Sequence, residues 1–166
     1  MSGTLYLISL PIGCSSDISE RAKEALKTLS VLACEDTREV AKLLRDFSIP
    51  PNKQLISLYE HNERRRVSEV IEVLKGGEDV GLVVSRGTPL ISDPGYLVTR
   101  EAIREGIGVK VLPGPVACVT ALLLSGLPPD KFSFLGFPPR KKGEQLRFFE
   151  RFKASQITLI FYESPR

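Results

Sequence analysis

Residues 80–95 read VGLVVSRGTPLISDPG, an apolar run followed at once by a loop rich in glycine, proline and small polar residues. An almost wholly apolar run of this length is typical of a strand buried on both faces, as in a parallel sheet. The stretch therefore predicts a buried strand over residues 80–85 whose carboxyl end opens into an extended loop over residues 86–95.

The alternation of strand and helix continues on both sides of this stretch. Strand-like runs occupy residues 4–9, 31–34, 55–59, 109–112, 132–137 and 157–163. Segments with helical spacing of apolar residues lie between them, at about 18–29, 37–47, 63–75, 96–105 and 116–124, and a basic helix is expected after residue 138. Asp17 is expected to open the first helix and Asp36 or Thr37 the second. We therefore predict an α/β fold with a mostly parallel sheet and helices on both faces.

Composition excludes several classes of protein. The 166 residues are 42% hydrophobic and 26% charged, which is ordinary for a globular domain. No apolar run approaches the roughly 20 residues of a membrane span, and the N-terminus lacks the basic start of a signal peptide. Three scattered cysteines and one histidine fit neither a disulfide framework nor a metal site, so we expect no metal and a reduced, cytoplasmic protein.

Positive charge is concentrated in one segment. The chain carries a net charge of +3, and residues 138–153 hold six Lys or Arg against two Glu. A local excess of this kind favours contact with a polyanion, although a solvated helix face is an equally good interpretation.

Four loops at the predicted carboxyl ends of strands share a composition of glycine, proline and small polar residues. They lie at residues 11–13, 35–38, 86–95 and 113–115. Ligands of open α/β sheets bind at this edge. The dinucleotide fingerprint, the P-loop and the hydrolase nucleophile elbow are all absent from the sequence. The loops therefore favour a ligand held by shape and main-chain hydrogen bonds, such as an adenosine derivative.

Seven motifs occur together in a characteristic order: LPIG (10–13), CEDTR (34–38), YEHNER (59–64), GTPLISDPGY (87–96), LPGP (112–115), FLGFPPRKKGE (134–144) and FYESP (161–165). On these motifs the chain resembles the tetrapyrrole methylase superfamily from about Gly3 to Arg166. EDTR, EHNER and SDPGY point to the branch that methylates a cytidine ribose of 16S rRNA in the small ribosomal subunit.

The resemblance implies a cofactor, S-adenosylmethionine, bound between two α/β domains. It also implies residues 1–130 as the N-terminal cofactor-binding domain and 131–166 as a linker and the first elements of a truncated second domain. Nothing follows the last apolar run to cover it, so Phe161 and Tyr162 are expected in an exposed patch. A homodimer is expected, without contact to membranes.

The family's cofactor positions map onto the strand-end loops and the last strand. They correspond to Pro11, Arg86, Gly87, Thr88, Ile91, Val116, Ala117 and Glu163, and the same segments add the candidates Gly13, Ser85, Asp93, Gly114 and Tyr162. The chain departs from the family's usual pattern at Cys14, where Asn is usual, at Ser85-Arg86, where Asp-Ala is usual, and at Val116, where Ser is usual.

Methyl transfer to a ribose hydroxyl is an in-line displacement in which a base can take the hydroxyl proton. Glu35 and His61 are the catalytic candidates, and Asp36 is a third possible base. Each has a structural alternative, because Asp36 can cap a helix, Glu35 can favour a helix dipole and His61 can occupy a turn. The candidate RNA-binding residues are Arg38, Asn62, Arg64, Arg140, Lys141 and Lys142, for which the alternative is a solvated surface.

Two other functions remain open from the sequence. One is a methyltransferase of the same superfamily that acts on a tetrapyrrole or another small molecule. The other is a non-catalytic cofactor-binding or scaffold protein. The basic segment and the EDTR and EHNER motifs favour RNA.

Overall fold

The computed structural model describes residues 1–59 and 61–164 of the chain. Contacts divide it into two compact units, Met1–Pro115 and Val116–Arg166, and each is described by itself. This division falls before the boundary predicted at residue 130, since the helix that follows Pro115 groups with the later residues. The domain boundary of the complete protein stays a prediction.

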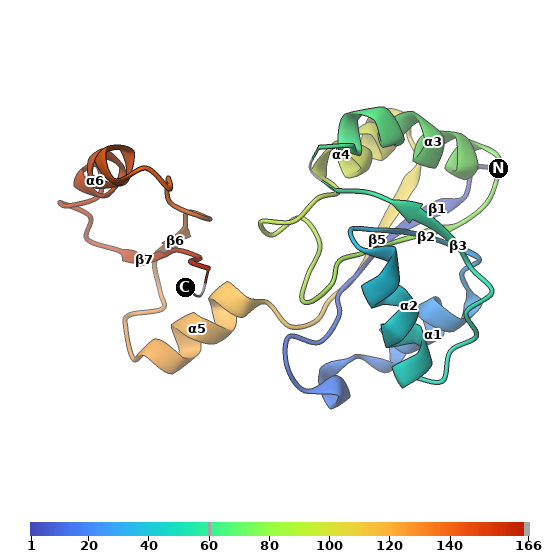
Figure 1. The fold of residues 1–166 in the computed structure, drawn as a ribbon, viewed down its shortest axis with the longest axis horizontal. Helices are drawn as coiled ribbons and strands as arrows, with labels where there is room; N and C mark the ends of the chain where they lie inside the picture. Colours follow the sequence, from blue (N-terminus) through green and yellow to red (C-terminus); the bar gives the residue numbers. More distant parts are fainter. Residues whose placement is uncertain (60, 165–166) are drawn as a thin grey trace. The chain divides into compact units, whose positions relative to one another are not determined.

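The first unit is a five-stranded parallel sheet in the order β3-β2-β4-β1-β5. Helices α1 and α2 cover one face, and α3 and α4 cover the other (Figure 1). The predicted α/β fold with helices on both faces is therefore confirmed. The elements are β1 (Thr4–Ile8), α1 (Glu20–Thr28), β2 (Val31–Cys34), α2 (Thr37–Asp46), β3 (Gln54–Ser57), α3 (Glu63–Lys75), β4 (Val80–Val83), α4 (Tyr96–Arg104) and β5 (Gly108–Leu112).

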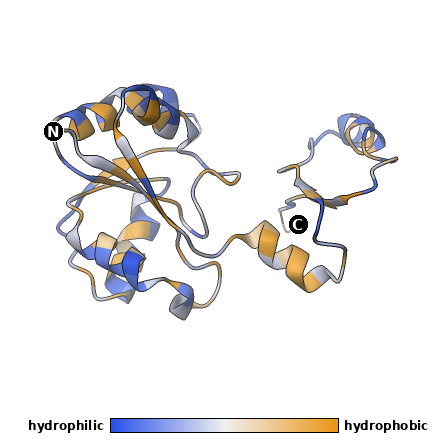
Figure 2. Ribbon diagram, turned by 180° about the vertical axis from the view of Figure 1, so that it is seen from behind, coloured by the Kyte–Doolittle hydropathy of each residue, from blue (hydrophilic) through white to orange (hydrophobic). Residues whose placement is uncertain are grey.

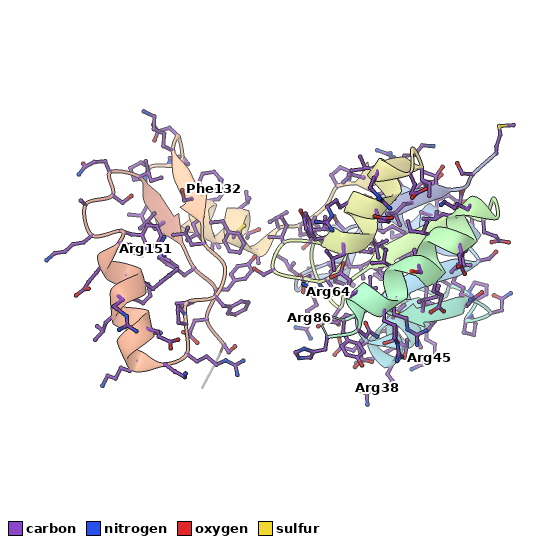
Figure 3. All side chains as sticks on the ribbon, turned by 90° about the horizontal axis from the view of Figure 1, so that it is seen from above. Arg38, Arg45, Arg64, Arg86, Phe132 and Arg151 are labelled. Atoms are coloured by element: carbon purple, nitrogen blue, oxygen red, sulfur yellow. The ribbon has the colours of Figure 1, made fainter. Side chains whose placement is uncertain are left out.

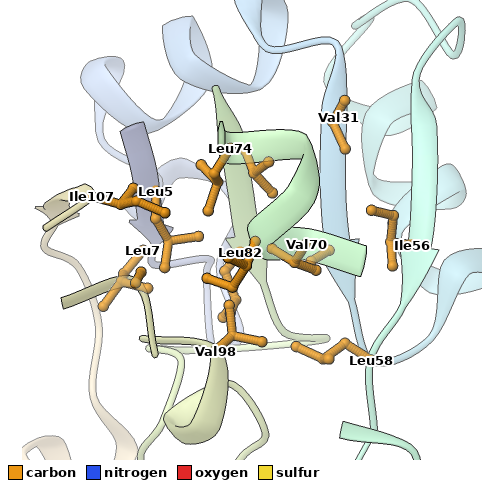
Figure 4. Close-up of a cluster of buried hydrophobic side chains, with 14 residues drawn as sticks. Leu5, Leu7, Val31, Ile56, Leu58, Val70, Leu74, Leu82, Val98 and Ile107 are labelled. Carbon is orange, nitrogen blue, oxygen red and sulfur yellow. The ribbon is translucent and has the colours of Figure 1, made fainter. Parts of the chain in front are cut away.

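Successive strand residues supply two separate cores because their side chains point to opposite faces of the sheet. Leu5, Leu7 and Leu82 join the cluster under α3 and α4, which Figure 4 shows around Val70 and Leu74. Ile8 and Leu32 join the cluster under α1 and α2. Both faces of the central strands are thus apolar, as the uninterrupted apolar run at residues 80–84 predicted.

The second unit contains α5 (Ala117–Ser125), β6 (Phe132–Phe134), α6 (Lys142–Glu150) and β7 (Thr158–Ile160). β6 and β7 pair in parallel, with Phe134 opposite Ile160. Phe161 packs edge-on against Phe149 of α6 at a centroid distance of 5.1 Å. Figure 2 shows that α5 is hydrophobic over most of its length.

Local details differ from the sequence predictions at several places. β3 and β4 end at Ser57 and Val83, two residues before the predicted ends of these strands. Asp17 does not open α1; it ends a short 3-10 helix, η1 (Ser15–Asp17), and Ser19 caps α1 by accepting a hydrogen bond from the Ala22 amide. The two last strands are shorter than predicted. Phe161 and Tyr162 are half-buried rather than exposed, because they pack against the aromatic rings of the same unit.

Within residues 1–59 and 61–164, no helix is both long and apolar enough to cross a bilayer.

Candidate functional site

Three loops at the carboxyl edge of the sheet are tied to one another by hydrogen bonds. They follow β1, β4 and β5, which are neighbours in the sheet. Leu10 and Gly87 exchange backbone hydrogen bonds of 2.8 and 3.1 Å. The Thr88 hydroxyl donates to the Pro115 carbonyl at 3.0 Å and lies 2.9 Å from the Ser9 hydroxyl. We call Ser9, Leu10, Gly87, Thr88 and Pro115 the strand-end junction. This junction brings the predicted residues Gly87 and Thr88 together with the first loop.

Gly114 allows two of these loops to approach closely. A Cβ atom at this position would lie 2.8 Å from the Cβ of Ser9, a separation that real side chains do not tolerate. At Gly13, by contrast, a Cβ would meet nothing within 4 Å. Open space therefore borders the main chain at Gly13, whereas Gly114 is required for two loops to pack together.

The long loop, residues 86–95, has an unusual backbone. Leu90 and Ser92 adopt left-handed conformations with φ of 73° and 66°, and Gly87 and Gly95 have φ of 78° and 117°. Non-glycine residues seldom adopt positive φ, and such strain persists only where surrounding contacts impose it. Residues in such conformations cluster at functional sites, so the loop is a candidate functional segment.

Glu63 supplies the contact that fixes the far end of the long loop. Its side chain is 7% exposed, and its Oε1 accepts hydrogen bonds from the amides of Gly95 at 3.0 Å and Leu97 at 2.7 Å. The carboxylate of α3 thus occupies the N-terminus of α4, where the helix dipole favours negative charge. With the strand-end junction at one end and Glu63 at the other, both ends of the long loop are anchored.

Three acidic residues near this edge have different environments. Asp36 caps α2, and a hydrogen bond from the Arg38 side chain is the largest of the interactions that lower its pKa to about 2. Asp93 is half-buried in the long loop, and burial, with the nearby Glu35 charge, raises its pKa to about 6. Glu35 itself is exposed directly after β2. The structural alternative for Asp36 is confirmed, and a carboxylate with so low a pKa is a weak base.

The YEHNER motif is largely a turn. Asn62 accepts a hydrogen bond from the Tyr59 amide at 2.8 Å and donates one to the Ser57 carbonyl at 3.0 Å, so its side chain holds the connection from β3 to α3. His61 is exposed in this turn. Glu60, the remaining residue of the motif, lies outside the described residues.

A cavity of about 390 Å³ lies within the first unit, between the first loop and α2. Four of the predicted cofactor residues line it: Pro11, Gly13, Ser85 and Arg86. Lys42 and Phe47 contribute to the opposite wall. Ile91 and Asp93 are half-buried in the long loop and do not line the cavity.

The remaining cofactor candidates belong to the second unit. Val116 is the N-cap residue of α5 and Ala117 its first residue. The Tyr162 hydroxyl accepts a hydrogen bond from the Cys118 amide at 3.1 Å, which joins the end of β7 to the start of α5. Glu163 is exposed, and its carboxylate accepts a hydrogen bond from the Ser164 amide.

The basic candidates are exposed in both units. Arg38 forms an ion pair with Asp36 at 2.8 Å, and Lys141 lies 3.6 Å from Glu144. Arg64, Arg140 and Lys142 have no carboxylate partner within residues 1–59 and 61–164. Figure 3 shows Arg64 and Arg86 on the surface of the first unit.

Sequence reasoning missed Glu63 and Ser9. Glu63 lies inside a quoted motif, but a glutamate at the start of a helix is ordinarily solvated, and nothing local marked it as buried. Ser9 ends a strand like many other small residues. In the described part of the chain, no three His, Cys, Asp or Glu residues gather as a metal site would require.

The sequence of this chain is similar to one known protein family over nearly its whole length. The family model for tetrapyrrole (corrin/porphyrin) methylases matches residues 4–166. A protein of Halalkalibacterium halodurans named ribosomal RNA small subunit methyltransferase I is 46% identical over 163 residues, which are 98% of this chain and 56% of that protein. The proteins of the same name from Escherichia coli O157:H7 and a Hydrogenobaculum species are 43% and 44% identical, and the chain covers 56% and 70% of them. The chain therefore spans little more than half the length of most of these relatives.

Solved structures share the fold at low sequence identity. A crystal structure of diphthine synthase aligns with a TM-score of 0.74 and 18% identity, over 99% of this chain and 66% of that one. A uroporphyrin-III C-methyltransferase from Thermus thermophilus aligns with a TM-score of 0.61 and 21% identity, over 92% of this chain and 74% of that one. At these identities the likeness concerns the fold alone.

Proposed function

This chain belongs to the tetrapyrrole methylase family, and on that premise we propose that its protein is an S-adenosylmethionine-dependent methyltransferase of small-subunit ribosomal RNA. We further propose that it methylates the 2′-hydroxyl of a cytidine in 16S rRNA. The observation that carries the proposal is the 46% identity over 163 residues to a ribosomal RNA small subunit methyltransferase I. The exposed basic residues of α6 and its flanks support an RNA substrate.

The residues at the carboxyl edge fit a ligand of this kind. The open space beside the main chain of Gly13, in the cavity that Pro11, Ser85 and Arg86 also line, supports a ligand bound partly through main-chain groups. Arg86 is exposed, so its guanidinium has access to solvent and need not lie beside a positively charged sulfonium. Pro11, Gly87, Thr88 and Ile91 would hold the cofactor in the first unit, and Val116, Ala117 and Glu163 in the second.

When bound, S-adenosylmethionine would supply an electrophilic methyl group with a neutral thioether as the leaving group. The protein aligns the ribose hydroxyl and removes its proton. Glu35 and His61 remain proposed participants, since both are exposed on loops at the ends of β2 and β3. The proposed RNA contacts remain Arg38, Asn62, Arg64, Arg140, Lys141 and Lys142. Asn62 also holds the turn between β3 and α3.

The proposed setting is the bacterial cytoplasm, with the small ribosomal subunit as partner and a homodimer as the working form. Light scattering of the full chain as encoded by its gene tests the dimer. A monomer at all concentrations would refute it.

Methylation of 30S subunits is the decisive experiment. Subunits from a strain that lacks this gene are incubated with the full chain and S-adenosylmethionine, and the product is mapped by mass spectrometry. We expect one added methyl group on a cytidine ribose of 16S rRNA, and calorimetric binding of S-adenosylhomocysteine but not of NAD. Binding of S-adenosylhomocysteine without any methylation of 30S subunits would refute the RNA substrate.

A further inference from the structure

Glu63 joins two loops that each carry an exposed tyrosine. Its backbone amide donates to the Tyr59 carbonyl at 2.9 Å, and its carboxylate accepts from the Gly95 and Leu97 amides at 3.0 and 2.7 Å. Tyr59 follows β3, and Tyr96 stands between those two amides at the start of α4. Because both loops leave the carboxyl edge of the sheet, the two tyrosines belong to the edge at which open α/β sheets bind ligands.

Both tyrosine side chains are open to solvent. Tyr96 is 58% exposed and Tyr59 is 44% exposed. The Arg100 guanidinium lies over the Tyr96 ring, 5.5 Å from its centroid, and the attraction between a cation and an aromatic face favours this arrangement. Single exposed aromatic residues are ordinary on a protein surface, so the charge beside the rings must decide whether they face a ligand.

Two arginines without carboxylate partners lie on the same two helices. Arg64 directly follows Glu63 in α3, and Arg100 lies in α4. Both are exposed, and within residues 1–59 and 61–164 no carboxylate lies at ion-pair distance from either; Figure 3 shows Arg64 on the surface of the first unit. The neighbouring carboxylates are already engaged, since Glu63 is bonded to two amides and Glu101 is paired with Arg104. The positive charge is therefore available to an anionic partner.

Exposed rings beside unpaired guanidinium groups match the chemistry of unpaired RNA nucleotides. The bases of such nucleotides stack on aromatic side chains, and their phosphates pair with arginine. A duplex, by contrast, keeps the faces of its bases stacked on one another and offers chiefly phosphates and sugars. The combination of rings and charge thus favours a single strand over a duplex and over a neutral protein surface.

We propose that Tyr59, Arg64, Tyr96 and Arg100 form a binding surface for single-stranded RNA, with bases stacked on the two tyrosine rings and phosphates at the two arginines. We call these four residues the tyrosine–arginine surface. The inference rests on the proposed function, which supplies an RNA substrate, and it adds base stacking to the phosphate contacts proposed above. In this surface Glu63 is a positioning residue, because it holds the two loops together without being exposed itself.

Stacking and charge make contributions that can be separated by experiment. Stacking requires an aromatic ring but no hydroxyl group, and it tolerates any base. A phosphate contact depends on charge and therefore on salt. Inorganic polyphosphate carries the charge without any base, so it engages the arginines and not the rings.

Five variants of the full chain test the inference: Tyr96→Ala, Tyr96→Phe, Tyr59→Ala, Arg100→Gln and, as a matched control, Ile103→Ala, which truncates a side chain of α4 that is 64% exposed. Fluorescence anisotropy measures affinity for oligocytidylate of about 12 nucleotides, which is within the usual site size of single-strand-binding folds. The same measurement is made with an RNA duplex of equal length and with polyphosphate. Calorimetry with S-adenosylhomocysteine and urea unfolding report on the cofactor site and the fold.

We expect Tyr96→Ala and Tyr59→Ala each to bind the single strand about 5-fold to 100-fold more weakly, as the loss of one stacked base requires. Their affinities for the duplex and for polyphosphate should stay within about twofold of the wild type, and Tyr96→Phe should retain the affinity for the single strand. Arg100→Gln should weaken binding of the single strand and of polyphosphate, and should lower the slope of log affinity against log salt for the single strand by roughly 0.7. Ile103→Ala should match the wild type with every probe, and all variants should keep their affinity for S-adenosylhomocysteine.

The inference is overturned if Tyr96→Ala and Tyr59→Ala bind the single strand as the wild type does, or if they lose affinity equally for the single strand, the duplex and polyphosphate. It is also overturned if both variants bind every RNA probe normally and yet methylate 30S subunits more slowly, because the surface would then contact a ribosomal protein. In these cases methylation of 30S subunits by the wild type persists, so the proposed function stands. If the wild type does not methylate 30S subunits but binds the single strand through these rings, the proposed function fails and the RNA-binding surface is upheld.

Discussion

At the scale of single residues, two aspartates in loops that follow strands have opposite properties. Asp36 accepts several hydrogen bonds, and the one from the Arg38 side chain contributes most to lowering its pKa to about 2. Asp93 lacks such donors, and burial raises its pKa to about 6. The first carboxylate stabilises the folded chain at neutral pH, and the second destabilises it.

The pH dependence of stability tests this contrast. The folded chain binds the Asp93 proton more tightly than the unfolded chain, so this group's stabilisation is present below pH 3.8 and is lost as the pH rises through about 6. We expect Asp93→Asn to be more stable than the wild type at pH 7.5, by about 1 kcal/mol after allowance for solvent screening, and equal to it near pH 4. Urea unfolding at both pH values measures the difference.

Asp36→Asn serves as the opposite case. Asp36 has a lowered pKa, so its contribution is present above the ordinary 3.8 and is lost as the pH falls through about 2. The Asn variant should be less stable than the wild type at pH 7.5. A gain in stability for this variant, or a loss for Asp93→Asn, would contradict the assignment of the two environments.

At Gly81, close packing leaves no room for a larger side chain. It lies in β4, and a Cβ atom there would come within 2.7 Å of Leu32 and 3.0 Å of Ile8. Gly81→Ala should lower the free energy of unfolding by about 1–3 kcal/mol, because overpacking a dense core forces side chains from their rotamers. Gly13→Ala, with nothing within 4 Å of the added atom, is the control and should leave folding stability nearly unchanged.

At the scale of elements, α3 and α4 are joined by more than apolar contact. The buried Glu63 carboxylate satisfies the amides of Gly95 and Leu97 at the start of α4. Since the first amides of a helix have no partner within the helix, a side chain from another element here both caps α4 and ends the long loop.

Glu63→Ala should therefore loosen the long loop. It leaves two amides without their acceptor, and we expect a loss of about 1–3 kcal/mol in the free energy of unfolding. Hydrogen exchange should rise at the amides of Gly95 and Leu97 and across residues 86–95, while the amides of α1 stay protected. Glu72→Ala, an exposed position on the same helix, controls for helix propensity, and equal exchange in the two variants would argue against the anchor.

At the scale of the whole molecule, charge is divided unequally between the two units. Residues 116–166 hold eight Lys or Arg against four Asp or Glu, whereas residues 1–115 hold 15 against 16. The positive excess thus lies in the second unit, around α6, where Arg151 is also exposed (Figure 3). An RNA partner would be attracted chiefly to that unit.

Replacement of Arg140, Lys141 and Lys142 by Ala should weaken RNA binding broadly, because phosphate contacts carry no base specificity. The slope of log affinity against log salt should fall by roughly one unit for each lost contact. Filter binding to 16S rRNA between low and physiological salt measures both effects. As the control, Arg21, Lys23 and Lys27 of α1 are replaced by Ala. An equal loss of RNA affinity in this control would mean that net charge alone is responsible.

The sequence by itself determined the elements of this protein and their order. Every predicted strand and helix is present, and α3 and β2 have the bounds that apolar spacing gave. The physical reason is local: periodicity of apolar side chains, a capping aspartate at position 36 and a glycine after α3 and α4 act within a few residues of one another. The order of motifs likewise indicated the family without any coordinates.

Only the tertiary structure decided which residues meet. The Ser9 and Thr88 hydroxyls are 79 positions apart, and Glu63 reaches an amide 32 positions away. It also decided that Glu63 is buried and that Asp93 is half-buried, with the Glu35 charge near it. Hydrogen bonds and desolvation act over a few ångströms in space, and the strand order β3-β2-β4-β1-β5, which creates those neighbours, is not a property of any local stretch of sequence.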